Sequence, residues 1–391
     1  MNKKYLLILG LVFYILSASA TFAFFALNHK NSVSQSGTEN QVAQEEETAL
    51  GTLLKISPDE PQDQPCPLNG QLYTKTEKEA WSKRRPLAVM IENSPDARPQ
   101  SGLTRADVVY EALAEGGITR FMGLFYCAAQ RDDVTLAPIR SARTYFIDWA
   151  SGYNRPMYVH VGGANIPGPA NALGQLSEYG WTMANDINQF SVGYPTFVRN
   201  KNRLGHPVAT EHTMQTSTEK LWQVAEKRGW TNINPKTNED WAEGYEGLSF
   251  MPVGEETEVG TINDVKYDFW SGYNQFAAEW KYDPEKKVYL RFTGGEPHKD
   301  LNNDEQLYAK NVVVLKTRVK GPIDELKHML YQTTGTGDAL VFTNGQVYQV
   351  KWKKPKRTSE LNFYDKTGKP FKFNRGLIWI SALDNSNKVE Y

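Results

Sequence analysis

The feature that most constrains this chain is an apolar run of 23 residues, Tyr5–Leu27, which contains no charged side chain. As a helix this run would span about 35 Å, enough to cross a hydrocarbon core of about 30 Å. Lys3 and Lys4 precede the run, and the positive-inside rule places such an end in the cytoplasm. We therefore expect residues 1–27 to be a single-pass signal anchor. The chain would be held in the cell membrane through residues 5–27, with its folded domains extracytoplasmic.

The alternative for this run is a cleaved signal peptide with Ala18-Ser19-Ala20 as the processing site. The run stays apolar through Phe25 and Leu27, beyond the point where a processing site should turn polar, and this favours an uncleaved anchor. No cysteine lies near the end of the run, so a lipid-modified cysteine is excluded there.

The segment that follows the anchor, residues 28–65, is acidic and poor in large apolar side chains. Such a composition buries too little surface to offset the entropy of ordering the chain. We expect a flexible acidic tether.

Charge and cysteine content exclude several classes of protein. The 44 Lys and Arg nearly balance the 45 Asp and Glu, so the strong basic excess of a nucleic-acid binder is missing. The two cysteines, Cys66 and Cys127, are too few for a disulfide scaffold or a four-thiolate zinc site. A single disulfide between them is chemically allowed outside the cell, and the residues leave it open.

Two folded parts are expected after the tether. Residues 66–240 mix apolar β-prone runs with helical stretches, which predicts an α/β or α+β domain. The helices are expected from Ser141 to about Gly152, over Pro169–Tyr179 and over Thr216–Arg228.

Residues 241–391 read as a mainly-β domain of short alternating strands. Asn344-Gly345 predicts a two-residue hairpin turn, and one short helix is expected at Ile323–Tyr331. Nine bases against two acids between Lys351 and Arg375 indicate either a solvated hairpin edge or a contact with anionic polymer or lipid.

The densest polar signal, of arginines, acids and amides, lies in residues 92–143, and His160 follows it at the end of an apolar strand. Arg140 and Arg143 bracket the expected helix start at Ser141, where unpaired N–H groups favour an anion. Guanidinium groups bind phosphate, pyrophosphate or carboxylate bidentately. The candidate ligand-binding residues are Asn93, Arg98, Arg105, Arg120, Arg140, Ser141, Arg143 and His160. The alternative is that Arg98, Arg105 and Arg120 form structural ion pairs with Asp107, Glu111 and Glu115.

Acidic residues in the same region raise the question of a metal. Asp107, Glu111 and Glu115 are spaced by four, so they would share a face of a strand or a helix. Glu92, Asp107 and Glu111 could hold Mg²⁺, which takes oxygen ligands, or could be solvated surface acids. His206, Glu211 and His212 do not have the spacing of a zinc helix.

A series of ordered motifs resembles the YerB-like bacterial family. The motifs are Arg85–Asn93, Ala97–Leu103, Arg105–Glu111, Glu115–Arg120, Pro138–Arg143 and His160–Gly163. The resemblance implies a cell-surface protein with an N-terminal and a C-terminal domain of unknown function, from a family whose members are often described as lipoproteins.

A fainter similarity points to the LytR–CpsA–Psr group, which transfers lipid-linked polymers onto the cell wall. Arg105-Ala106-Asp107 stands where that group has Arg-Ser-Asp, whereas Pro138–Ser141 lacks the Asp of its second motif. Our first hypothesis is an envelope protein that binds an anionic ligand, either wall polymer or a lipid-linked phosphate. The alternatives are a Mg²⁺-dependent phosphoryl or glycopolymer-phosphate transferase and an envelope scaffold that binds no ligand.

Overall fold

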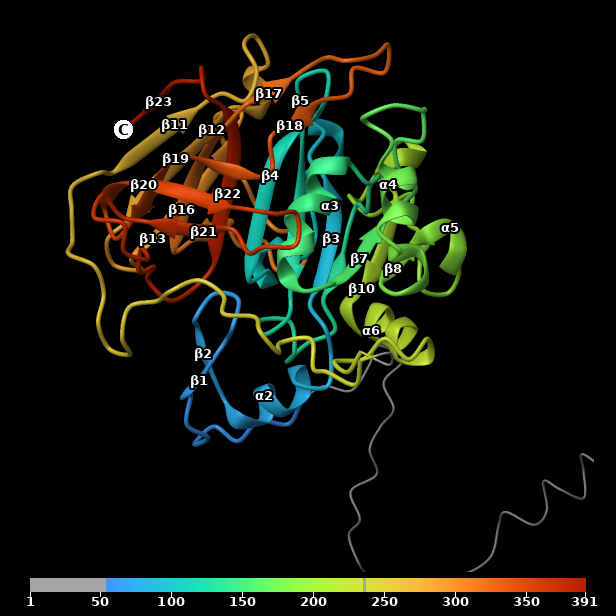
Figure 1. The fold of residues 1–391 in the computed structure, drawn as a ribbon, viewed down its shortest axis with the longest axis horizontal. Helices are drawn as coiled ribbons and strands as arrows, with labels where there is room; N and C mark the ends of the chain where they lie inside the picture. The colour runs from blue at the N-terminus through green and yellow to red at the C-terminus, as the bar shows by residue number, and fades with distance from the viewer. Residues whose placement is uncertain (1–53, 235–236) are drawn as a thin grey trace, which may run out of the picture. The chain divides into compact units, whose positions relative to one another are not determined.

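The computed structural model describes residues 54–234 and 237–391, and its centre is a sheet of ten strands (Figure 1). In sheet order the strands are β21 (Asn362–Tyr364), β20 (Gln346–Lys354), β19 (Gly335–Thr343), β16 (Asn311–Thr317), β22 (Ile378–Asp384), β4 (Val108–Glu115), β5 (Ile118–Phe125), β3 (Leu87–Glu92), β7 (Met157–His160) and β8 (Asp186–Asn188). The predicted anchor, residues 1–27, lies outside the described residues. Within the described part, no helix is both long and apolar enough to cross a membrane.

Strands from both predicted domains share this sheet. The C-terminal strand β22 lies between β16 and β4 and runs parallel to both. On the other side of β4, strand β5 runs antiparallel to β4 and to β3, and β3, β7 and β8 are parallel. The structure thus has the predicted α/β region and the predicted strand-rich region, with their backbones joined by strand pairing.

Both faces of the sheet are buried at its central strands β22, β4, β5 and β3, as their long apolar runs require, whereas residues of β19 and β20 alternate or are exposed. All six residues of β3 are buried, and they alternate between two cores: Leu87, Val89 and Ile91 face one, and Ala88 and Met90 face the other. The helices that surround the sheet are α2 (Lys75–Trp81), α3 (Thr144–Ala150), α4 (Ala172–Glu178), α5 (Gln189–Val192) and α6 (Thr218–Lys227). Helices α2, α3 and α4 contribute to the second core, and α6 contributes to the first.

The first core is completed by a six-stranded sheet from the C-terminal half. Its strands are β11 (Asp264–Tyr267), β12 (Ala278–Asp283), β13 (Val288–Thr293), β14 (Glu296–Pro297), β15 (Tyr308–Ala309) and β23 (Val389–Glu390). Three smaller sheets comprise β1 (Gln64–Pro65) with β2 (Leu72–Tyr73), β6 (Thr135–Leu136) with β9 (Val198–Arg199) and β10 (Met214–Ser217), and β17 (Val319–Lys320) with β18 (Leu330–Tyr331).

The predicted hairpin at Asn344-Gly345 is confirmed. Strands β19 and β20 pair in register from Thr343↔Gln346, and both turn residues have the positive φ of a type I′ turn. The basic stretch from Lys351 to Arg375 includes β21, the outermost strand of the sheet, as the hairpin-edge interpretation predicts.

Two helix predictions need correction. Helix α3 begins at Thr144 with Arg143 at its N-cap, because Ala142 still bonds Gly162 as extended backbone. The helix expected at Ile323–Tyr331 is wrong: Leu330 and Tyr331 form β18, whose backbone pairs with β17 across the loop of residues 321–329. At both places, backbone hydrogen bonds to another extended segment override the helix propensity of the sequence.

A buried ion pair joins the two large sheets. Nη2 of Arg291, on β13, lies 2.8 Å from Oε2 of Glu111, on β4, and both side chains are fully buried. The guanidinium lies over the ring of Trp280 at 4.9 Å and over that of Trp379 at 4.7 Å. Glu111 also accepts from Trp379 Nε1 and Thr119 Oγ1. The pair is therefore desolvated and held on several sides.

We predict that Arg291→Met lowers the free energy of unfolding by about 3–5 kcal/mol, because it leaves the Glu111 carboxylate buried without its counter-charge. The double variant Glu111→Gln with Arg291→Met should recover most of that loss, since no buried charge remains. Urea unfolding of the wild type, both single variants and the double variant measures the coupling. Additive losses would contradict a desolvated pair.

A disulfide between Cys66 and Cys127 ties the β1–β2 hairpin to the end of β5 and spans 61 positions of sequence. This pairing was left open by the sequence. Both residues are buried. Closing a loop of this size removes conformational entropy from the unfolded chain, so the bond stabilises the folded state mainly through the unfolded one.

We predict that replacing both cysteines by alanine lowers the free energy of unfolding by about 4 kcal/mol. Denaturant unfolding of the variant and of the oxidised wild type measures the difference. Alkylation of denatured, unreduced protein supplies the control: incorporation of label at both cysteines would show that the bond is absent.

Candidate functional site

The candidate site lies at one edge of the ten-stranded sheet, where several strands end. Strands β3, β4, β7 and β8 run in the same direction, so their carboxyl ends meet at this edge together with the amino end of antiparallel β5. Glu92 ends β3, Glu115 ends β4, and Arg120 lies opposite Glu92 near the start of β5. In open sheets of this kind, ligands bind at the carboxyl ends of the strands.

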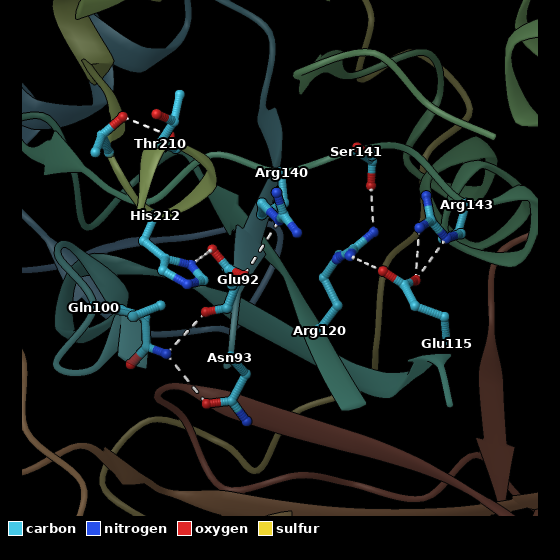
Figure 2. A network of polar contacts seen from close by, with 12 residues as sticks. Glu92, Asn93, Gln100, Glu115, Arg120, Arg140, Ser141, Arg143, Thr210 and His212 are labelled. Atoms are coloured by element: carbon cyan, nitrogen blue, oxygen red, sulfur yellow. Dashed lines mark hydrogen bonds and ion pairs between the residues drawn. The ribbon is translucent and has the colours of Figure 1, made fainter. Parts of the chain in front are cut away.

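Three arginines gather at this edge, and we call Arg120, Arg140 and Arg143 the arginine group. Figure 2 shows Arg120 between Arg140, which faces Glu92, and Arg143, which faces Glu115. Arg120 comes from β5, whereas Arg140 and Arg143 lie in the extended segment that leads into α3. The sequence analysis placed five arginines, Arg98, Arg105, Arg120, Arg140 and Arg143, in one site, and the structure brings three of them together.

Glu115 holds two of the three guanidinium groups. Its Oε1 lies 2.8 Å from Arg120 Nη2, and its Oε2 lies 2.6 Å from Arg143 Nη2. Burial by itself raises the pKa of Glu115, but Arg120 and Arg143 outweigh that effect and lower this pKa to about 2. Glu115 is therefore a carboxylate at any physiological pH.

Arg140 is held more loosely than its two neighbours. Its Nε lies 3.3 Å from Glu92 Oε1, an ion-pair distance without hydrogen-bond alignment. The other oxygen of Glu92 bonds His212 Nδ1 at 2.9 Å. The Arg140 side chain is 26% exposed, against 3% for Arg120 and 8% for Arg143. Arg140 is thus the member of the group that a ligand can reach.

The charges in the arginine group do not balance. Three guanidinium groups stand at ion-pair distance from two carboxylates, those of Glu92 and Glu115. Glu211 is exposed and makes no ion pair with a described residue. Burial lowers the pKa of Arg140 and of Arg143, and the neighbouring Arg120 charge lowers both further. Glu92, Glu115 and Glu211 oppose this effect on the pKa of Arg140, and Glu115 opposes it on that of Arg143. The surplus of one guanidinium over the carboxylates at ion-pair distance favours an anion.

Ser141 and His160 lie beside the arginine group, Ser141 bonded through its backbone and His160 through its ring. The backbone oxygen of Ser141 accepts from Arg120 Nη1 at 2.9 Å. His160 is fully buried, with Nδ1 2.6 Å from Gly162 O and Nε2 2.6 Å from Asp186 Oδ1. His160 therefore fixes the loop after β7 and offers no free ring nitrogen to a ligand.

Asn93 and Arg98 belong to a neighbouring network rather than to the arginine group. Arg98 Nε donates to Asn93 Oδ1 at 3.1 Å, and Gln100 Nε2 donates to the same oxygen at 3.1 Å. Figure 2 shows the bonds of Gln100 to Asn93 and to the backbone of Glu92. Asn93 also donates to Thr119 on β5.

Arg105 lies apart from the other arginines. Its side chain is 45% exposed and pairs with Asp132 at 2.9 Å. Of the three ion pairs offered as the alternative for Arg98, Arg105 and Arg120, the structure contains one, Arg120 with Glu115.

The acids proposed as metal ligands are not brought together. Asp107 is buried beside the disulfide, where it accepts from the backbone N–H groups of Tyr126, Cys127 and Ala128. Burial raises the pKa of Asp107 to about 7, although these hydrogen bonds oppose the rise. Glu111 is held by Arg291 and Glu92 by Arg140 and His212. Among the described residues the one cluster with metal-ligand spacing is Cys66, Asp107 and Cys127, and its sulfurs form the disulfide. These acids do not fit a Mg²⁺ site.

The expectation that Asp107, Glu111 and Glu115 share a face is also wrong, and a β-bulge explains why. The register of β4 with β5 shifts between Leu113 and Glu115. An extra residue turns the following side chain to the other face of the sheet. Glu111 therefore faces Arg291 and the six-stranded sheet, whereas Glu115 faces Arg143 at the start of α3.

Two residues of this region, His212 and Arg291, were not predicted from the sequence. His212 binds Glu92, but its sequence neighbourhood indicated only a failed zinc motif. Arg291 neutralises Glu111 from 180 positions away, and no local pattern signals such a pair.

Comparison with known proteins shows which family the chain belongs to. A family described as "Protein of unknown function (DUF3048) N-terminal domain" matches residues 72–231, and the corresponding C-terminal domain matches residues 265–380. The Bacillus subtilis (strain 168) protein named "Putative lipoprotein YerB" is 30% identical over 326 residues, which is 83% of this chain and 88% of that protein. The crystal structure of the YerB protein from Bacillus subtilis covers 84% of this chain and 99% of its own, with a TM-score of 0.67 and 26% identity. The resemblance to the YerB-like family is confirmed, and the chain belongs to the DUF3048 family.

Proposed function

We propose that this protein is a membrane-anchored extracytoplasmic binding protein whose arginine group holds a phosphate-bearing or carboxylate-bearing anion of the cell envelope. The observation that carries the proposal is the charge imbalance of three converging guanidinium groups against two carboxylates at ion-pair distance. A phosphate on wall polymer or on a linked lipid would supply the missing negative charge, and forked guanidinium groups suit its oxygens.

Two further observations support the extracytoplasmic location. The disulfide between Cys66 and Cys127 suits an oxidising compartment. The relative from Bacillus subtilis is a lipoprotein by name, and in this chain the apolar run of residues 5–27 would take the place of the lipid.

We predict that Arg140→Gln weakens the binding of inorganic pyrophosphate at least tenfold, because it removes the most accessible charge of the group and leaves the buried pair of Glu115 with Arg120 and Arg143 intact. Isothermal titration calorimetry of the full chain in detergent, at two salt concentrations, measures the loss and its ionic character.

Arg105→Gln is the matched control, since Arg105 carries the same charge at an exposed site and pairs with Asp132. Equal affinities of Arg140→Gln and wild type, or no pyrophosphate binding by the wild type, would leave the scaffold alternative standing.

We also predict that Mg²⁺ does not bind at Glu92, Asp107 and Glu111, because each of these acids is already held by separate partners. Equilibrium dialysis of Mg²⁺ with wild type and with Glu92→Gln should give the same result for both. A bound ion that Glu92→Gln removes would favour the transferase alternative.

A further inference from the structure

A surface pocket separate from the arginine group lies between the two halves of the chain. It is a cavity of about 370 Å³ on the surface, and we call it the Arg98 pocket. Its lining includes Pro95, Arg98 and Pro99 from the N-terminal half and Thr293, Pro297 and His298 from the C-terminal half. The volume is within the range of small-ligand sites, and three prolines give it largely apolar walls.

Arg98 brings an uncompensated charge to this pocket. Its Nε and Nη2 donate to the Oδ1 and the backbone oxygen of Asn93, and its Nη1 donates to Gln275 O. These acceptors are all neutral, and no described carboxylate lies within ion-pair distance of Arg98. A guanidinium has five N–H groups, so one N–H remains on each of Nη1 and Nη2. Burial lowers the pKa of Arg98 to about 10, which leaves it charged at neutral pH.

The hydrogen bonds around Arg98 also fix the state of His298. Arg98 Nε can only donate, so the Asn93 atom that it meets is the amide oxygen. Gln100 therefore turns its amide nitrogen toward that oxygen and its Oε1 toward His298 Nε2, 2.6 Å away. It follows that Nε2 carries the proton and that Nδ1 is left as a lone-pair acceptor.

Two buried polar atoms of the pocket residues have no hydrogen-bond partner within the described part of the chain: His298 Nδ1 and Thr293 Oγ1. Burial lowers the pKa of His298 well below its usual value, and the charges of Arg291 and Arg98 lower it further, so the ring is neutral. Both atoms are covered from solvent, so a bound group would reach them only by displacing the side chains that cover them. At the rim, exposed Glu296 and Lys299 carry opposite charges.

We propose that the Arg98 pocket binds the carboxyl end of a short peptide with small apolar side chains. The two free N–H groups of Arg98 would take the carboxylate, and its single charge would balance the uncompensated guanidinium. The acceptor His298 Nδ1 would take a peptide N–H, the Thr293 hydroxyl would donate to a carbonyl oxygen, and the proline walls would pack on the side chains. This combination differs from the arginine group, where several charges converge.

The test uses the full chain in detergent. The probes are N-acetyl-Ala-Ala in its all-L form and in its all-D form, each as the free acid and as the carboxamide. Ligand-observed saturation-transfer NMR and competition titration measure the affinities. We expect at least one acid to bind and its carboxamide to bind at least tenfold more weakly. The preferred configuration distinguishes a protein tail from a peptide of D-residues. No binding of either acid, or equal binding of acid and amide, overturns the proposal.

Two variants and one control complete the design. Arg98→Gln should weaken binding of the preferred acid at least tenfold, and Thr293→Val, which keeps the side-chain shape, about threefold. Arg105→Gln should bind as the wild type does. Pyrophosphate binding should be the same in Thr293→Val as in the wild type, which separates this pocket from the arginine group. If thermal melting shows that Arg98→Gln does not fold, Thr293→Val decides: wild-type affinity for the acid in that variant overturns the proposal.

Discussion

The buried ion pair of Arg291 with Glu111 is the interaction on which the arrangement of the two halves depends. A charge removed from water is tolerated only when a counter-charge and hydrogen bonds surround it. Neither half can bury its own member of the pair alone, because Glu111 belongs to β4 and Arg291 to β13. The tryptophans on either side of the guanidinium, Trp280 and Trp379, come from both sheets and extend the same coupling. The two halves thus stabilise each other through chemistry that is costly when they are apart.

The two candidate sites differ in charge and in the chemistry of the residues that line them. The arginine group has several cations, partly compensated by Glu92 and Glu115, at the carboxyl ends of parallel strands. The Arg98 pocket has one cation, neutral hydrogen-bonding groups and proline walls, and it needs both halves of the chain. The first suits a polyvalent anion, and the second suits a monovalent one with an apolar body. Glu92, Asn93 and Gln100 connect the two networks by hydrogen bonds, as Figure 2 shows.

Much of the fold follows from patterns in the sequence, whereas the site follows only in part. Strands such as β3 and the β19–β20 hairpin could be predicted because apolar runs and Asn-Gly turns act locally. Of the five arginines that the sequence placed in one site, Arg120, Arg140 and Arg143 converge, whereas Arg98 and Arg105 lie in other contacts. The separate positions of the Asp107, Glu111 and Glu115 side chains could not be predicted. A bulge of one residue reversed the face of Glu115, and a partner 180 positions away captured Glu111.

The position of β22 between β16 and β4 has a consequence for how the protein is made. Residues that pair across this junction, such as Ser381 and Glu111, lie 270 positions apart in the chain. During synthesis, the edge of β4 that will receive β22 stays unpaired until almost all of the chain has emerged. An exposed strand edge of this kind invites pairing with other chains. The protein therefore passes through a long period in which this edge of β4 is open, and a chaperone would have its greatest effect in that interval.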